Sequence, residues 1–295
     1  MNGALVVNPL IALAALLTLV PLFAAAFCPS SLQLPRRLPL LPRILAPALL
    51  GLPYTLVSMA TGVFRWHWLA LYTLLPVAIT LLLYQASVSD PQQRGDWGDL
   101  LILLLLGLAV DLRWFEGAWG PRLGVFNKML LLDAGIYGFH VIRQLRGAGF
   151  DLRLRLGDLG VGLAALAAYA PIAVVLGLML GFLHFQPVTP SVLHALAAWV
   201  FTFFFIAVPE ELFFRGWMQN LLDRRVRPAR GLLITSTLFG LSHFNKRAAA
   251  FNWRYVLLAT LAGIFYGLAW RQQRRVGASA ITHASVDTIW SLWLR

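Results

Sequence analysis

Long apolar runs recur along the whole chain, and polar residues are concentrated in the short stretches between them. A run of about 18 or more apolar residues is typical of a transmembrane helix. The pattern predicts ten helical segments, at residues 4–27, 44–64, 67–87, 97–112, 123–142, 159–184, 191–222, 230–246, 253–270 and 276–293. The fourth and fifth segments fit least well, so eight or nine spans stay open as alternatives.

The composition supports a membrane protein. Of the 295 residues, 59% are hydrophobic and 12% are charged, and the mean hydropathy is +0.74. Soluble domains carry about 25% charged residues, so an ordinary soluble fold is excluded. No long polar segment leaves room for a separate soluble domain. We therefore expect an all-α fold, a polytopic transmembrane helical bundle of about eight to ten spans.

The net charge of +12 does not indicate a nucleic-acid-binding protein. Basic residues lie in short loops between apolar runs, without the aromatic interleaving of a nucleic-acid-binding module. With ten spans, fifteen basic residues fall on one side of the membrane and seven on the other. By the positive-inside rule, the arginine-rich loops face the cytoplasm and both termini face outward.

The seventh segment contains an unusual charged stretch, Val208–Gly216 with the sequence VPEELFFRG. The chain has only three glutamates, and two of them, Glu210 and Glu211, stand together here. Pro209 suits a first helical turn, so we expect the helix to be kinked or restarted beside them. Glu211 and Arg215 are four residues apart and predict an ion pair. Glu210 points about 100° away from that pair, which makes it a candidate general base.

Polar residues also interrupt the eighth and tenth segments, at His243 and at His283 and Asp287. Together with Glu210 they lie between eight and fourteen residues from the arginine-rich loops. At 1.5 Å per residue, all four side chains fall about 12–21 Å in from the same side. Charged groups this deep in a bilayer usually face a cavity or a partner. The matched depth predicts one shared site on three helices.

Each of these residues alone also has a structural interpretation. Glu211 and Arg215 could form a purely structural ion pair, and His243 could be a hydrogen-bonded packing histidine. His283 and Asp287 share a helix face and could simply orient one helix. The functional interpretation depends on their occurring together.

Three short motifs carry a resemblance to a known family. They are EELFFR at Glu210–Arg215, FGLSH at Phe239–His243 and HASVD at His283–Asp287. This order resembles the CPBP family, the CAAX prenyl endopeptidases and related glutamic-type intramembrane proteases. The resemblance covers roughly Asp158 to the C-terminus. It implies two domains, N-terminal transmembrane helices without assignment at 1–157 and a CPBP-like protease core at 158–295.

The resemblance also implies roles for the motif residues. Glu210 resembles the glutamate that activates water, and His243 the histidine that helps to position that water. His283 and Asp287 occupy positions that support the transition state. The predicted catalytic residues are Glu210, Glu211, Arg215, His243, His283 and Asp287.

Asp287 departs from the prenyl endopeptidases, which have asparagine there. An ionised aspartate cannot donate a hydrogen bond to an oxyanion. Either Asp287 is protonated, or it orients His283 and the imidazole is the donor. Two histidines and two carboxylates could also hold a divalent metal such as zinc, although the chain has no HExxH motif to decide this.

The expected function is that of an intramembrane endopeptidase that cleaves a membrane-anchored protein or peptide precursor. The arginine-to-lysine ratio of 22 to 2 favours a GC-rich bacterium, and hence the bacterial inner membrane. Two alternatives from other classes stay open. One is a proton- or cation-coupled transporter, because intramembrane Glu, His and Asp also build proton relays. The other is a non-catalytic membrane scaffold or immunity protein with the same fold.

Overall fold

The computed structural model describes residues 8–153, 155–187, 189–246 and 250–294. The described residues form helices joined by short connections, with no strand among them. The chain divides into two compact units, Met1–Leu145 and Arg146–Arg295, which are described separately below. The predicted all-α class is confirmed.

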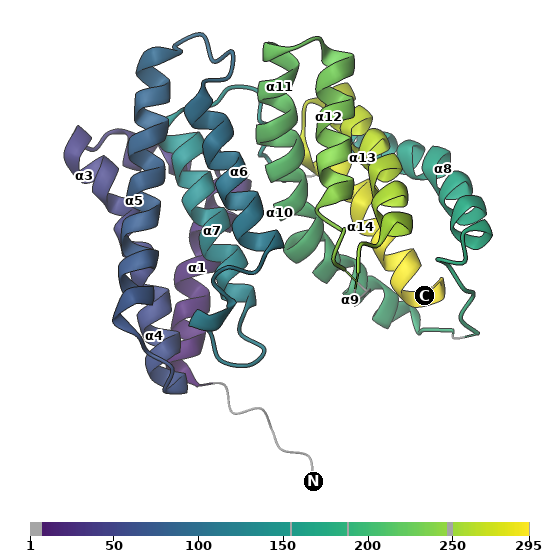
Figure 1. Ribbon diagram of the computed structural model, residues 1–295, viewed down its shortest axis with the longest axis horizontal. Helices are drawn as coiled ribbons and strands as arrows, with labels where there is room; N and C mark the ends of the chain where they lie inside the picture. Colours follow the sequence, from purple (N-terminus) through teal and green to yellow (C-terminus); the bar gives the residue numbers. More distant parts are fainter. Residues whose placement is uncertain (1–7, 154, 188, 247–249, 295) are drawn as a thin grey trace. The chain divides into compact units, whose positions relative to one another are not determined.

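Unit 1 contains a short-linked series of helices (Figure 1). Their bounds are α1 (Pro9–Phe27), η1 (Pro29–Leu32), α2 (Gln33–Arg36), α3 (Leu40–Leu45), η2 (Ala46–Leu50), α4 (Gly51–Thr61), α5 (Trp66–Ser89), α6 (Trp97–Asp111), η3 (Glu116–Ala118), α7 (Val125–Ile136) and η4 (Tyr137–Ile142). Helix α7 packs against α1, α5 and α6, and ten of its twelve residues are buried. It therefore forms the centre of this unit.

Unit 2 contains α8 (Leu156–Met179), α9 (Val192–Thr202), η5 (Phe203–Ala207), α10 (Val208–Glu211), η6 (Leu212–Gln219), α11 (Asn220–Arg225), α12 (Pro228–Leu241), α13 (Trp253–Gln273) and α14 (Val276–Trp293). Helix α14 is its central element, because it packs against α8, α9, η5 and α13. Helices α12 and α13 lie side by side in Figure 1. The predicted chemistry is carried by α10, η6, α12 and α14.

Within the described ranges, each of the ten predicted segments corresponds to a helical stretch, although several ends differ. The sixth segment ends at Met179 and not at residue 184, and residues 4–7 of the first lie outside the described part. Seven stretches are long and apolar enough to cross a membrane: Pro9–Phe27, Leu40–Thr61, Trp66–Ser89, Val125–Ile142, Leu156–Met179, Val192–Arg225 and Trp253–Gln273. Helices α6 and α12 have only 15 and 14 residues. The chain is an integral membrane protein, and a count of ten spans stays a prediction.

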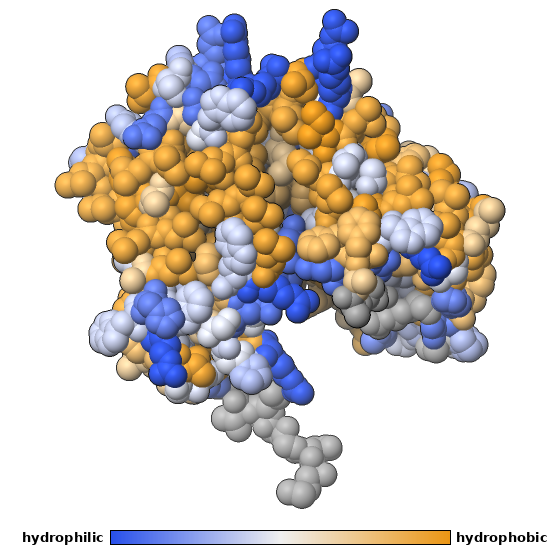
Figure 2. Space-filling model, in the orientation of Figure 1, coloured by the Kyte–Doolittle hydropathy of each residue, from blue (hydrophilic) through white to orange (hydrophobic). Residues whose placement is uncertain are grey.

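The outer surface of each unit is apolar, as lipid contact requires. In the view of Figure 2, the surface over α5 and α6 is largely hydrophobic and hydrophilic side chains gather near the ends of these helices. Leu74, Leu81 and Leu104 are all about half exposed or more, with 64%, 46% and 58% of their surface accessible. Such exposed leucines would be costly in water but are suited to a hydrocarbon environment.

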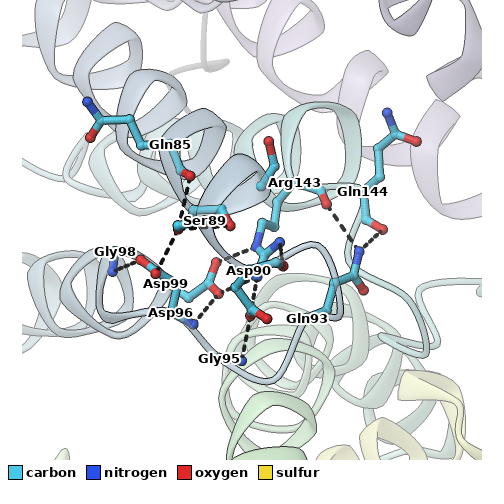
Figure 3. A network of polar contacts seen from close by, with 12 residues as sticks. Gln85, Ser89, Asp90, Gln93, Gly95, Asp96, Gly98, Asp99, Arg143 and Gln144 are labelled. Atoms are coloured by element: carbon cyan, nitrogen blue, oxygen red, sulfur yellow. Dashed lines mark hydrogen bonds and ion pairs between the residues drawn. The ribbon is translucent and has the colours of Figure 1, made fainter.

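One buried ion network joins the ends of α5, α6 and η4 in unit 1 (Figure 3). Arg143 donates to both carboxylate oxygens of Asp99 at 2.9 Å and to the Asp90 carboxylate at 2.8 Å. Burial alone would raise the pKa of the Asp90 carboxyl. Backbone hydrogen bonds from Arg94 and Gly95, together with the Arg143 guanidinium, outweigh it and bring that pKa below its usual value.

A second arginine, Arg275, joins the start of α14 to the start of α8 in unit 2. Arg275 donates from Nε to Asp158 at 2.9 Å and from Nη1 to Asp151 at 3.0 Å. Beside it, the Val276 amide donates to the Gly149 carbonyl at 2.9 Å. Gly149 has φ +73°, and a Cβ there would overlap the backbone of Arg274. These contacts hold the start of α14, and so the helix that carries His283 and Asp287, against the start of α8.

Candidate functional site

Glu210 and Glu211 lie in a long helical stretch, Val192–Arg225, with unusual geometry. The segments on both sides of α10, η5 and η6, have π-helical hydrogen bonding. Pro209 lacks an N–H and cannot donate the hydrogen bond of an ordinary α-helix. The wider π turns accommodate this missing hydrogen bond. Because Ala207 and Val208 keep helical dihedrals, no new helix N-terminus forms at Pro209. Of the two predicted alternatives, a kinked or a restarted helix, these dihedrals exclude the restart.

The predicted ion pair between Glu211 and Arg215 is present and fully buried. Arg215 Nε donates to Glu211 Oε2 at 3.0 Å, and both side chains are 0% exposed. The guanidinium carbon lies 5.1 Å from the centre of the Phe239 ring, a cation–π distance. The other Glu211 oxygen, Oε1, lies 2.9 Å from His283 Nδ1. Glu211 therefore joins η6 to α14.

His283 is held between carboxylates on both of its nitrogens. Its Nδ1 donates to Glu211, because a carboxylate oxygen only accepts. On the other side, Nε2 lies 3.5 Å from Asp287 Oδ2 and 3.9 Å from Glu210 Oε2. The His283 side chain is 2% exposed, whereas those of Glu210 and Asp287 are each 30% exposed. Two accessible carboxylates thus flank one buried imidazole.

His243 lies in the turn that directly follows α12, and a backbone carbonyl of α12 orients its ring. Its Nδ1 is 2.8 Å from the Phe239 carbonyl oxygen, so this nitrogen carries the hydrogen. In the neutral imidazole, Nε2 is then a lone-pair acceptor. The ring of Phe239 lies 5.0 Å from the His243 ring and 5.6 Å from the His283 ring. Phe239 therefore packs between the two histidines.

A cavity of about 90 Å³ opens beside these groups, between α8, α12, α13 and α14. His243, His283 and Asp287 form part of its wall, and most of the remaining wall is apolar or aromatic. Phe182 and Trp290 stack with ring centres 5.5 Å apart in the same wall. A small polar cluster at the edge of an apolar hollow is the usual form of a ligand site.

The arrangement does not fit a resident metal ion such as zinc. Glu211 gives one oxygen to Arg215 and the other to His283, and both nitrogens of His283 face carboxylates. Glu211 and the Nδ1 atom of His283 are therefore already engaged with each other. Within the described part of the chain, no three His, Cys, Asp or Glu side chains are placed to hold a metal ion.

Comparison with known proteins gives one match. Residues 192–289 match the family model of the type II CAAX prenyl endopeptidase Rce1-like proteins. This part of the chain is therefore similar to the CAAX prenyl endopeptidase-like (CPBP) family. The matched residues contain all three motifs and every predicted site residue. No curated protein and no solved structure shows a significant match to the chain.

The structure adds residues to the CPBP-like site that the motifs do not contain. Tyr266 of α13 stacks on His283, with ring centres 4.8 Å apart and an angle of 15°. Trp199 of α9 donates from Nε1 to Ser285 at 3.0 Å and so braces the same turn of α14. The sequence offered one signal for Tyr266, since it lies between Gly263 and Gly267 on a helix face where backbones approach closely.

Proposed function

We propose that the chain is an intramembrane endopeptidase in which Glu210 activates water for hydrolysis of a peptide bond. The observation that carries this proposal is the pair of partly exposed carboxylates, Glu210 and Asp287, on either side of the buried His283. The similarity of residues 192–289 to type II CAAX prenyl endopeptidase Rce1-like proteins supports this proposal. A carboxylate with access to water beside a cavity is suited to general base catalysis.

The proposed reaction follows from these positions. Glu210 removes a proton from water, and the resulting hydroxide attacks the carbonyl carbon of the substrate. The C–N bond of the tetrahedral intermediate then breaks, and Glu210 returns the proton to the leaving amine nitrogen. The lone pair on His243 Nε2 accepts a hydrogen bond from the attacking water and orients it.

The remaining site residues hold this geometry. Glu211 orients His283 through its Nδ1 hydrogen bond, and Arg215 neutralises the buried Glu211 charge. Asp287 faces His283 Nε2 and fixes the imidazole from the other side. A partner on each ring nitrogen leaves the imidazole one orientation.

The proposed substrate is a membrane-anchored protein or a peptide precursor, and the proposed location is the bacterial inner membrane. An apolar cavity beside a polar cluster favours a substrate segment with apolar side chains. The composition that favours a bacterial source is the excess of arginine over lysine.

The test compares membrane proteins from cells that express the wild type or Glu210→Gln. Mass spectrometry identifies protein N- and C-termini after a timed incubation of the membranes. Termini produced by the wild type should form about 10²–10⁴-fold more slowly in the variant, the contribution of a general base. Glu116→Gln is the matched control, because Glu116 is an exposed glutamate paired only at 3.8 Å with Arg113. Identical termini in all three samples, with equal protein abundance, would exclude the protease function.

A transporter is the alternative that the same residues allow. Glu210, His283, Glu211 and Asp287 form a connected series of proton-binding groups within the helical bundle. In proteoliposomes that contain a pH-sensitive dye, a transporter would move protons along an imposed gradient and lose this flux in Glu210→Gln. A protease should show no flux above that of empty liposomes.

A further inference from the structure

Tyr266 is a buried aromatic residue at the centre of the site that none of the three motifs contains. Its side chain is 1% exposed, and its ring stacks on the His283 imidazole and meets Phe239 edge-on at 5.8 Å. It also lines the cavity that His283 and Asp287 border. The stacked geometry holds the phenol beside the imidazole in the wall of this cavity.

The Tyr266 hydroxyl has no hydrogen-bond partner among the described residues. A second buried tyrosine of unit 2 differs in this respect. The Tyr169 hydroxyl donates to the Leu258 carbonyl at 2.9 Å. Buried hydroxyl groups are nearly always hydrogen-bonded, because an unmet one costs free energy. The Tyr266 O–H is therefore available to a ligand in the cavity.

Peptide hydrolysis requires a hydrogen-bond donor where the carbonyl oxygen becomes negative. The neighbouring groups are poorly suited to that role. Ionised Glu210 and Asp287 only accept hydrogen bonds. His283 faces carboxylates with both nitrogens, and His243 donates its Nδ1 hydrogen to the Phe239 carbonyl. The Tyr266 hydroxyl lies next to His283 and Asp287. It is a donor that is not hydrogen-bonded to any carboxylate or carbonyl oxygen of the described residues.

We propose that Tyr266 is a catalytic residue that donates its phenolic O–H to the developing oxyanion. The inference rests on the proposed function. The bond is a hydrogen bond without proton transfer: the phenol keeps its proton while the carbonyl oxygen gains negative charge, and the contact weakens when the C–N bond breaks and the carbonyl re-forms. Tyr266 thus supplies what an ionised Asp287 cannot.

The experiment compares Tyr266→Phe with Tyr169→Phe. Each variant removes one hydroxyl and keeps the ring, so the stack on His283 is preserved. The probe is the set of endogenous membrane proteins in vesicles, and the readout is the initial rate at which Glu210-dependent termini appear. Thermal unfolding in detergent reports folding of each purified variant.

Tyr266→Phe should slow the appearance of these termini by about 10²–10³-fold, the loss expected for one oxyanion donor. Its Tm should change by less than about 2 °C, because no hydrogen bond within the protein is lost. Tyr169→Phe should do the opposite, with a lower Tm and a rate within about threefold of the wild type. Tyr169 lines the same cavity, but its hydroxyl is already bonded to the Leu258 carbonyl and is not available to the substrate.

The outcomes separate this inference from the proposed function. A wild-type rate in Tyr266→Phe, with Glu210→Gln inactive, would overturn the role of Tyr266 and leave the protease function intact. If Tyr266→Phe is slow and its Tm is lowered as much as that of Tyr169→Phe, the residue serves packing, which also overturns the proposal. If no terminus depends on Glu210, both proposals fail together.

Discussion

Two buried arginines, one in each unit, show how similar charged clusters can differ in role. In unit 1, Arg143 binds both oxygens of Asp99 and also the carbonyl and carboxylate of Asp90. In unit 2, Arg215 donates from Nε to Glu211, and its two terminal nitrogens have no hydrogen-bond partner among the described residues. The first cluster is saturated with hydrogen bonds, whereas the second is not.

The acidic partners differ in the same way. Asp99 is 0% exposed and is used entirely within its cluster. In unit 2, Glu211 is equally buried, but Glu210 and Asp287 beside it are each 30% exposed, and Asp287 lines a cavity. Buried ion pairs usually serve structure, and accessible charges beside a hollow serve chemistry. The comparison teaches that access of the carboxylates, and not the presence of a buried arginine, marks a site.

The largest expected difference is between Arg143→Gln and Arg215→Gln. Arg143→Gln leaves Asp99 buried without a cation, which costs about 3–5 kcal/mol, and Tm should fall by roughly 10 °C or more. Arg215→Gln should lower Tm less, because Glu211 keeps His283 as a partner. It should nevertheless slow cleavage by about tenfold or more, since a 1 Å shift of a positioned group has effects of this size.

Thermal unfolding and the rate of Glu210-dependent cleavage, both measured on the same detergent preparations, check this contrast. Equal losses of Tm in the two variants, with equal rates per folded molecule, would remove the distinction between the clusters.

A smaller contrast is expected between two glycines with positive φ. Gly62 ends α4 in unit 1 with φ +71° and open space around it, whereas Gly149 has φ +73° against the backbone of Arg274. Alanine at either position has a conformational cost of about 1–2 kcal/mol. Gly149→Ala adds a steric overlap, so its Tm should be clearly lower than that of Gly62→Ala. Thermal scans that rank the two variants in the reverse order would contradict the close contact at Gly149.

The smallest expected effect concerns acid stability. Hydrogen bonds from Arg153, followed by those from Arg275, hold the pKa of the Asp151 carboxyl well below its usual range. A carboxyl whose pKa is lowered by folding stabilises the protein above its unfolded value of about 3.9, and this contribution is lost as the pH falls further. Tm should therefore decrease below about pH 4, and Asp151→Asn should flatten that decrease.

Asp90 provides the comparison from unit 1. Its pKa is also lowered, but burial is the largest influence there and opposes the effect of Arg143 and of the backbone, whereas the hydrogen bond from Arg153 is the largest influence on Asp151. Asp90→Asn should consequently flatten the acid-dependent loss of Tm less than Asp151→Asn does. Thermal scans from pH 3 to pH 6 measure the dependence of Tm on pH in both variants. A larger flattening in Asp90→Asn than in Asp151→Asn would contradict the order inferred from the contacts.

The helices and the membrane location were predictable because they depend on local properties of the sequence. Apolar runs interrupted by short basic loops located every long helix, although their ends shifted by a few residues. The pair of Glu211 and Arg215 was also predictable, since residues four apart on a helix are neighbours wherever the helix lies.

Other features were decided only by tertiary structure. The π turns around Pro209 accommodate this residue within a continuous helix, where the sequence alone allowed a new helix to start. The contact of His283 with Glu211 was beyond the sequence pattern, because it joins helices separated by 72 positions in the chain. Tyr266 shows the limit most clearly. Its importance lies in what its ring stacks against and in the unpartnered hydroxyl, and both depend on how α13 packs on α14. Residue spacing determines which side chains share a helix face, but only packing determines which faces meet.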